Sequence, residues 1–265
     1  MNKVIIQGLF IVASFFLTWF ALQQVDWVEV LNVKQATQKT EEKLGEIFWE
    51  TVKKSEKIIK KQSVNNSVDS IVAKICTENS IDRDIIKVHI VDKDEVNAFA
   101  LPGSHLVIFS GLILACDNQE ELSGVICHEI AHIELNHVMK KLVKEIGLSV
   151  LISITTGNKN AETTKGVIKL LSSSAFDRSL EREADLKAVD FLVNAQINPE
   201  PFANFLYKLA DNDPDHMKYL SWISTHPESK ERAEEIIEYS KTKKIVAKPV
   251  LDSKTWDNLL FELRN

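Results

Sequence analysis

Cysteine and surplus positive charge are both scarce in this chain of 265 residues. Its three cysteines, Cys76, Cys116 and Cys127, include no CxxC pair, so a disulfide framework is excluded and we expect small buried apolar residues. Lysine and arginine number 32 against 38 acidic residues, and this net charge of -6 argues against a surface that neutralises nucleic-acid phosphates. The 45% hydrophobic content excludes disorder for most of the chain, and the length fits one large domain or two small ones.

The hydrophobic residues are unevenly distributed, with an uncharged run from Val4 to Leu22. At about 1.5 Å per residue, a helix of this length crosses a hydrocarbon core of about 30 Å. Lys3 precedes the run, whereas residues 23–33 carry acidic side chains and no lysine or arginine, which predicts a cytoplasmic amino terminus. We therefore expect residues 1–22 to be an uncleaved membrane anchor, and a cleaved signal peptide is the alternative.

The remainder of the chain shows mainly helical periodicity, which indicates an α+β fold with few strands. A linker and an amphipathic helical stalk are expected over 23–67, with a polar break at 63–67. Asp117 is expected to cap a long helix that runs to Lys144, and a helix end and polar loop are expected between 146 and 164. Further helices are expected at 68–78, 180–195, 201–210, 227–240 and 254–263.

One segment, from Lys87 to Phe109, has the composition of β-strands. It is rich in β-branched and aromatic residues, and Pro102-Gly103-Ser104 gives a turn signal between two short strands. We expect a small sheet that contains a hairpin.

The helix expected over 117–144 contains the sequence HEIAH, in which His128 and His132 lie four residues apart. Two such imidazoles project from one face of a helix and can bind a single tetrahedral zinc ion. Glu129 is placed to hold a water molecule at the metal and to take its proton. His137 lies about 180° from His128 around a continuous helix, so we expect it to point away and to be structural or exposed. The alternative is an ordinary helix whose histidines bind no metal.

A catalytic zinc of this kind needs a third protein ligand. Glu181 and Asp185 lie four residues apart on one face of the helix expected at 180–195, whereas Glu183 points elsewhere. One of the two carboxylates can bind zinc while the other accepts the N–H of a ligating imidazole. An exposed, charged helix with internal ion pairs is the alternative.

The chain resembles the gluzincin peptidases that include HtpX, BepA and the type 1 CAAX prenyl protease. The matching blocks, in the family's order, are NAFALPGSHLVIFSGL (97–112), HEIAH (128–132), FDRSLEREAD (176–185) and STHPESKER (224–232). The resemblance extends from about Val68 to Tyr239, and we expect a peptidase domain over 68–240 followed by a tail, 241–265, with a short helix.

This resemblance implies roles for individual residues. It makes His128, His132 and Glu181 the zinc ligands, Glu129 the general base and Asp185 the carboxylate that supports a ligating histidine.

The resemblance also implies two roles beyond the ligand set. His226 matches a histidine that either stabilises the tetrahedral oxyanion or acts as a reversible fourth zinc ligand, and both roles stay open. Arg232 matches an arginine that supports the same oxyanion.

An edge strand beside the active helix can take a substrate peptide as an added strand. Phe99, Ala100 and Leu101 are the candidate residues for this pairing, and a simple packed strand is the alternative. The glycine usually found after the proline and glycine of this block is replaced by Ser104.

Together these features predict a zinc-dependent metalloendopeptidase with one Zn²⁺ per chain, anchored through residues 4–22 in a bacterial-type cell membrane. Its catalytic domain is expected on the periplasmic side, and its expected substrates are unfolded or misassembled envelope proteins rather than nucleic acid. HtpX has several membrane spans and BepA carries a repeat domain, so the expected likeness is to small extracytoplasmic members. A non-proteolytic or latent chaperone-like protein that retains a zinc site is the alternative. The oligomeric state is not predicted.

Overall fold

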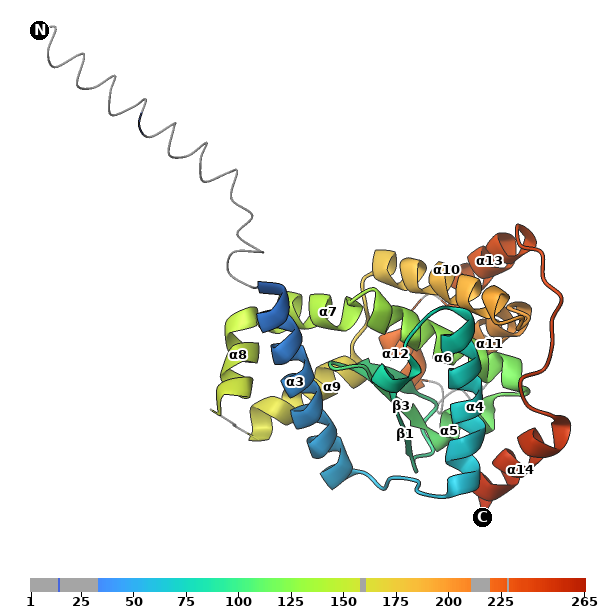
Figure 1. Ribbon diagram of the computed structural model, residues 1–265, viewed down its shortest axis with the longest axis horizontal. Coiled ribbons are helices and arrows are strands. Elements are labelled where there is room, and N and C mark those ends of the chain that lie inside the picture. The colour runs from blue at the N-terminus through green and yellow to red at the C-terminus, as the bar shows by residue number, and fades with distance from the viewer. Residues whose placement is uncertain (1–13, 15–32, 158–160, 211–219, 228) are drawn as a thin grey trace, which may run out of the picture. The chain divides into compact units, whose positions relative to one another are not determined.

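The computed structural model describes residues 14, 33–157, 161–210, 220–227 and 229–265 (Figure 1). The chain divides into two compact units, Met1–Glu41 and Glu42–Asn265, and helix α3 (Val33–Ser55) belongs partly to each. The anchor expected at 4–22 lies outside the described residues apart from Ser14. In the part of the chain that the structure describes, no helix has both the length and the apolar character needed to span a bilayer.

The second unit is mainly helical and holds one small sheet, as the α+β prediction requires. Its described helices after α3 are α4 (Gln62–Glu78), the short 3-10 helix η1 (Arg83–Ile85), α5 (Ser110–Ala115), α6 (Gln119–Glu134), α7 (His137–Ile146), α8 (Leu148–Thr156), α9 (Ala161–Ser173), α10 (Arg178–Asn194), α11 (Glu200–Ala210), α12 (Leu220–Thr225), α13 (Ser229–Lys241) and α14 (Ser253–Arg264).

The sheet has three described strands, β1 (Lys87–Val91), β2 (Ala98–Leu101) and β3 (His105–Phe109), in the order β1-β3-β2. β1 runs parallel to β3, and β2 pairs antiparallel with β3 so that Phe99 faces Val107. The predicted hairpin turn is confirmed, and both of its last two residues have positive φ, a region that glycine enters freely.

The sheet separates two hydrophobic cores, because successive side chains of a strand point to opposite faces. On β3, Leu106 and Ile108 pack with α4, α6, α10, α11 and α13 in the larger core. Val107 and Phe109 pack with α3, α7, α8 and α9 in the smaller core. The sheet thus fixes α6 and α9 on its two sides.

The stalk region differs from its prediction. Leu44 and Phe48 of α3 are fully buried in the smaller core, so this part of the helix packs into the second unit. The polar break expected at 63–67 is wrong, because those residues lie within α4. Val64 and Val68 give this turn a buried apolar stripe, which outweighs the polar character of its serines and asparagines.

The long helix expected to run to Lys144 is two helices, α6 and α7. Its cap is Asn118 rather than Asp117, because the Asn118 side chain accepts from the backbone N–H of Glu121 at 2.9 Å. The Glu121 carboxylate accepts in turn from the backbone of Asp117. The loop expected to extend to 164 is also wrong, because helix α9 begins at Ala161.

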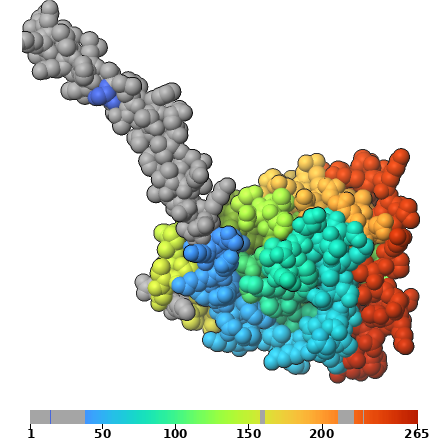
Figure 2. Space-filling view, viewed as in Figure 1, coloured from blue at the N-terminus to red at the C-terminus, as the bar shows by residue number. Residues whose placement is uncertain are grey.

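The carboxyl-terminal helix α14 packs beside α4, and Figure 2 shows it in red at the edge of the molecule.

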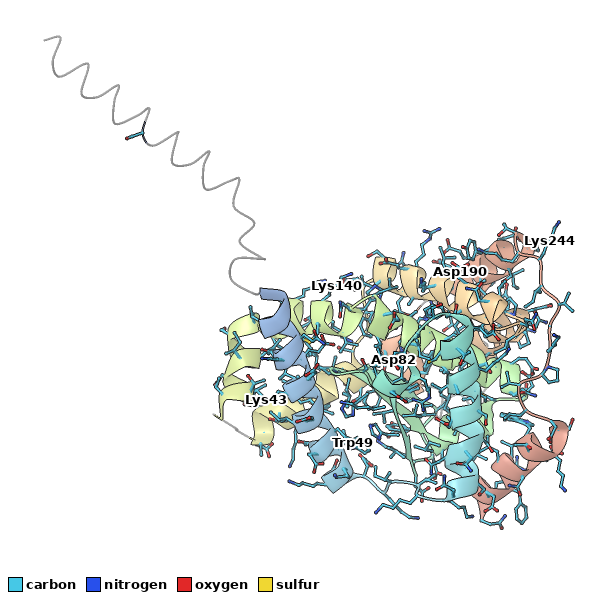
Figure 3. All side chains as sticks on the ribbon, viewed as in Figure 1. Lys43, Trp49, Asp82, Lys140, Asp190 and Lys244 are labelled. Atoms are coloured by element: carbon cyan, nitrogen blue, oxygen red, sulfur yellow. The ribbon has the colours of Figure 1, made fainter. Side chains whose placement is uncertain are left out.

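Trp49 of α3, labelled in Figure 3, stacks on His89 with ring centroids 3.5 Å apart, and His89 Nε2 lies 2.9 Å from His105 Nδ1. Burial lowers the pKa of His89 to about 3 and that of His105 to about 4, and the charge of Lys87 adds to both shifts.

Candidate metal centre

The residues of the HEIAH segment lie in the middle of α6, inside the protein. His128 and His132 are fully buried, and Glu129 is 1% exposed. Gly124, one turn earlier, allows α6 to approach α11, since a Cβ placed there would lie 2.3 Å from the Cβ of Phe202. The absence of a side chain at this position therefore permits the close packing of α6 on α11.

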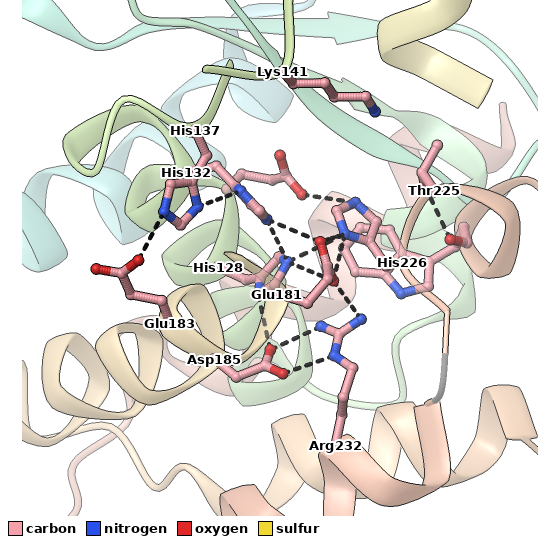
Figure 4. Close-up of polar contacts among 12 residues, drawn as sticks. His128, His132, His137, Lys141, Glu181, Glu183, Asp185, Thr225, His226 and Arg232 are labelled. Carbon is pink, nitrogen blue, oxygen red and sulfur yellow. Dashed lines mark hydrogen bonds and ion pairs between the residues drawn. The ribbon is translucent and has the colours of Figure 1, made fainter. Parts of the chain in front are cut away.

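Helix α10 packs against α6 and brings two carboxylates to the histidines (Figure 4). Glu181 Oε1 lies 3.3 Å from His132 Nε2, and Glu181 Oε2 lies 3.6 Å from His128 Nε2. Asp185 Oδ1 lies 2.9 Å from the other nitrogen of His128, Nδ1. This is the arrangement expected for the two carboxylates. Glu181 faces the Nε2 atoms of both histidines, and Asp185 contacts the opposite nitrogen of His128.

The segment from α12 to α13 brings His226 and Arg232 to the same place. His226 Nδ1 lies 3.2 Å from His128 Nε2 and 3.0 Å from each carboxylate oxygen of Glu181. Its Nε2 lies 3.3 Å from Glu129 Oε1. Arg232 donates two hydrogen bonds to Asp185, at 2.7 and 2.8 Å, and its Nη1 lies 2.6 Å from Glu181.

These donor atoms fit a tetrahedral zinc ion. His128, His132, Glu181 and His226 each offer one ligand atom, and the four atoms lie within 4.8 Å of one another. Ligands bound at about 2.0 to 2.1 Å in a tetrahedron are about 3.3 Å apart. The two Nε2 atoms of His128 and His132 are 3.0 Å apart, and the contacts of His226 and Glu181 fall in the same range. Imidazole nitrogens and carboxylate oxygens are also donor types that zinc prefers.

The buried charges at the site compensate one another. Burial raises the pKa of a carboxylate, but the charges of His226 and Arg232 hold the pKa of Glu181 well below its usual range. Arg232 also outweighs burial at Asp185 and lowers the pKa of that carboxyl. Burial acts to lower the pKa of His226, but Glu181 and Glu129 outweigh it and raise the pKa to about 9. The carboxylates are therefore ionised at neutral pH.

Two aromatic rings that the sequence did not single out cover the site. Phe176 stacks on His132 with ring centroids 4.2 Å apart, and Trp222 stacks on His226 at the same separation. Lys141 holds the segment that carries Phe176, because its ammonium donates to the Ser174 carbonyl and lies 4.1 Å from the Phe176 ring. Burial lowers the pKa of Lys141 to about 8.

Two small cavities approach the site. One, of about 200 Å³, is lined in part by Glu181 and Arg232, and another, of about 170 Å³, is lined in part by Lys141 and Phe176. Each of these two cavities is small for a peptide chain.

The structure does not place His137 as expected. It is fully buried, and its Nδ1 lies 3.0 Å from His132 Nδ1. The prediction that it points away is wrong because α6 ends at Glu134, and Asn136, just before α7, has a φ of 56°. Asparagine tolerates this left-handed conformation and often follows a helix end, which is the signal that sequence reasoning missed.

The candidate substrate strand is at an edge of the sheet but is not exposed. β2 pairs with β3 on one side only, yet Phe99, Ala100 and Leu101 are at most 5% exposed. Helix α9 packs on this strand, and Asn97 beside it donates to the Ser172 carbonyl at 3.2 Å. In the structure these residues form a packed strand.

Comparison with known proteins agrees with this site. The model of Peptidase family M48 matches residues 62–240. The chain belongs to peptidase family M48. The match covers every residue of the metal centre, and the family is one of zinc-dependent metallopeptidases. The predicted family resemblance is thereby confirmed, and the predicted enzyme class and zinc cofactor agree with this family membership.

Named relatives include bacterial and mitochondrial proteases. The beta-barrel assembly-enhancing protease of Yersinia pestis is 24% identical over 196 residues, which cover 69% of this chain and 40% of that protein. The mitochondrial metalloendopeptidase OMA1 of Bos taurus is 31% identical over 163 residues, which cover 56% of this chain and 31% of that protein. The OMA1 of Schizosaccharomyces pombe is 27% identical over 156 residues, 58% of this chain and 46% of that protein. The chain thus spans less than half the length of these relatives.

Proposed function

We propose that this chain cleaves unfolded or misassembled proteins through a zinc site formed by His128, His132 and Glu181. The observation that carries the proposal is the cluster of buried donor atoms around one position, with Glu129 beside it. A structural zinc site has no need of a carboxylate placed next to the ligands, whereas hydrolysis needs a base there.

A bound zinc ion supplies a Lewis acid that makes water nucleophilic at neutral pH. Glu129 then accepts the proton of the attacking water and delivers it to the leaving nitrogen. Burial tends to raise the pKa of Glu129, but the hydrogen bond and charge of His226 outweigh it and lower the pKa. Glu129 is therefore ionised, which is the state that a base requires.

Asp185 and Arg232 act behind the ligands. Asp185 faces Nδ1 of His128, so that nitrogen carries the proton and Nε2 keeps its lone pair for the metal. Arg232 is held by Asp185 and contacts Glu181, which supports a role in orienting the two carboxylates. Its predicted support of the oxyanion stays a prediction, as does the same role for His226.

A latent state is the second candidate, and one observation favours it. Nδ1 of His226 lies among the donor atoms, where it completes a set of four, and a zinc site with four protein ligands has no open position. We propose that the described arrangement is this closed state. Activity then requires His226 to leave the ligand set and the segment around Phe176 to move.

Substrate pairing along β2 belongs to the open state. We propose that Phe99, Ala100 and Leu101 offer their backbone to an extended peptide once α9 withdraws from the strand. The packing of α9 on β2 and the Asn97 contact with Ser172 are the interactions that such a movement breaks. The movement couples substrate entry to the release of Phe176, since α9 and Phe176 are joined by a short segment.

Location and substrates are further parts of the proposal. The uncharged run from Val4 to Leu22 supports a single anchor, with a catalytic domain over 68–240 and a tail over 241–265 on the periplasmic side. The name of the Yersinia pestis relative, an assembly-enhancing protease, supports misassembled envelope proteins as substrates. A reporter fused to the carboxyl terminus is expected to be active only outside the cytoplasm, and cytoplasmic activity contradicts this orientation.

The proposed reaction is tested with the full chain purified in detergent and with casein as an unfolded substrate. We expect cleavage, its loss on treatment with a chelator, and its return on addition of one equivalent of zinc per chain. Cleavage that persists in zinc-free protein contradicts the proposal.

A further inference from the structure

The interruption between α6 and α7 gives the second zinc ligand, His132, a partner of its own. Asn136 adopts φ 56° and ψ 28°, and α7 starts at the next residue, His137. In a continuous helix, five residues correspond to about 140° around the axis, which would separate the side chains of His132 and His137. The left-handed residue instead brings the two rings together, with centroids 5.0 Å apart.

The contacts of His137 form a chain from the ligand to the protein surface (Figure 4). His137 Nδ1 lies 3.0 Å from His132 Nδ1, and His137 Nε2 lies 3.3 Å from Glu183 Oε2. His137 is fully buried, whereas the Glu183 side chain is 53% exposed. Glu183 is the carboxylate of α10 that the helical pattern had placed away from the metal.

The proton positions in the contacts from His132 through His137 to Glu183 follow from the orientation of His132. Its Nε2 faces the other donor atoms, 3.0 Å from His128 Nε2, so it needs a lone pair and its proton resides on Nδ1. Nδ1 of His132 therefore donates, and Nδ1 of His137 accepts. The proton of His137 then resides on its Nε2, which donates to the Glu183 carboxylate. Each ring nitrogen of His132 and His137 is therefore either a donor or a lone-pair acceptor or ligand.

We propose that His137 and Glu183 are a positioning pair for His132, which fixes the tautomer and ring orientation that zinc binding requires. Asp185 contacts Nδ1 of His128 directly, whereas the Glu183 carboxylate reaches Nδ1 of His132 through the imidazole of His137. Both arrangements orient a ligating histidine. Outer partners of this kind orient a ligand and raise its basicity, and their loss weakens metal affinity by about 10- to 100-fold. This inference rests on the proposed zinc site.

A purely structural role for His137 predicts a different pattern. As a packed side chain, it would stabilise the fold through burial, and any apolar residue of similar size would replace it for metal binding. As a positioning residue, it is replaced only by a side chain that accepts a hydrogen bond from His132 Nδ1. Asparagine presents an amide oxygen near that point, whereas leucine presents none.

The experiment measures zinc affinity of the full chain in detergent by competition with a chelator, for the wild type and for His137→Leu, His137→Asn and Glu183→Gln. We expect His137→Leu to bind zinc at least about tenfold more weakly and His137→Asn to recover most of the loss. Glu183→Gln is expected to lie between the wild type and His137→Leu, because it keeps the contact but removes the negative charge. Cobalt-loaded protein provides a second readout, and its visible absorption bands are expected to shift in His137→Leu.

Two matched variants serve as controls. Asp190→Asn neutralises another carboxylate of α10, one that pairs with Tyr239 and Lys243, and His89→Leu removes a histidine outside the metal centre. Both are expected to bind zinc as the wild type does. If His137→Leu does not fold, the zinc affinities of His137→Asn and Glu183→Gln are still compared with that of the wild type. Unchanged zinc affinity in a folded His137→Leu, or equal losses in the Leu and Asn variants, overturns the inference. Failure of the wild type to bind zinc refutes the zinc site itself.

Discussion

Nε2 of His226 lies 3.3 Å from Oε1 of Glu129. Nδ1 of the same imidazole lies among the donor atoms of the candidate zinc site. His226 thus connects that site to the residue proposed as the general base. Because His226 cannot occupy the fourth coordination position and also leave that position open for water, this contact links the resting state of the site to its activity.

Removal of His226 tests whether it belongs to the ligand set. His226→Leu is expected to weaken zinc binding by more than about tenfold, since a direct ligand contributes at least as much as an outer partner. The dissociation constant is measured by chelator competition, with His89→Leu as the control histidine. Affinity equal to that of the wild type contradicts the fourth-ligand role and leaves the oxyanion role.

The choice of carboxylate ligand is tested by zinc content. Glu181→Ala is expected to be purified with less than about half an equivalent of zinc, because a closed ligand set has lost its one charged member. Glu183→Ala is expected to retain close to one equivalent, since Glu183 acts only through His137. Metal analysis of protein prepared without chelator distinguishes the two. The reverse pattern shows that the ligand was assigned to the wrong residue.

Arg232 is expected to be essential for stability as well as for the site. Arg232→Met leaves the carboxylates of Asp185 and Glu181 buried without their cation, and the free energy of unfolding is expected to fall by about 3 to 5 kcal/mol. Arg232→Lys is expected to restore little, because one ammonium does not reproduce the paired bonds to Asp185. Urea unfolding of zinc-free protein measures the effect.

The control for Arg232 is Arg182→Met, which removes an exposed arginine paired with Glu235. An exposed pair contributes about 0 to 1 kcal/mol, so this variant is expected to unfold almost as the wild type does. A loss in Arg232→Met no larger than in the control rules out the proposed role.

The pair His89 and His105 predicts a dependence of stability on pH outside the metal centre. Both have a pKa below the usual histidine value when folded, so between about pH 6.5 and about pH 4 the unfolded chain binds more protons and stability falls as the pH falls. Each contributes at most about 1.4 kcal/mol per pH unit, less for His89 because solvent screens its exposed part.

His89→Phe removes one of these titrating groups and keeps an aromatic ring against Trp49. We compare the free energies of unfolding of the two zinc-free proteins at about pH 7 and about pH 5. The free energy of unfolding of the wild type is expected to fall more than that of the variant when the pH is lowered. Parallel pH profiles for the two proteins contradict the pKa shift of His89.

Local sequence patterns were sufficient for the core of the site. The spacing of His128 and His132 and of Glu181 and Asp185 depends only on helical geometry, and the structure brings both pairs to one place. The hairpin was also predictable, because Gly103 allows the turn and the flanking residues are β-branched or aromatic. These features are encoded within a few residues of one another.

The remaining features depend on contacts between distant segments. His137 reaches His132 because of one left-handed residue, and the burial of β2 depends on α9, whose polar beginning resembles a loop. Phe176 and Trp222 look like ordinary apolar residues in the sequence. Their stacking on the histidines arises only when α10 and α12 pack around α6.

The proposed reaction is tested most directly by a paired measurement on wild-type and Glu129→Gln protein, in which casein cleavage and bound zinc are determined on the same samples. Glutamine keeps the size of the side chain but accepts no proton from water, so we expect cleavage to be abolished while about one equivalent of zinc stays bound. Equal cleavage by the two proteins would contradict the proposed reaction.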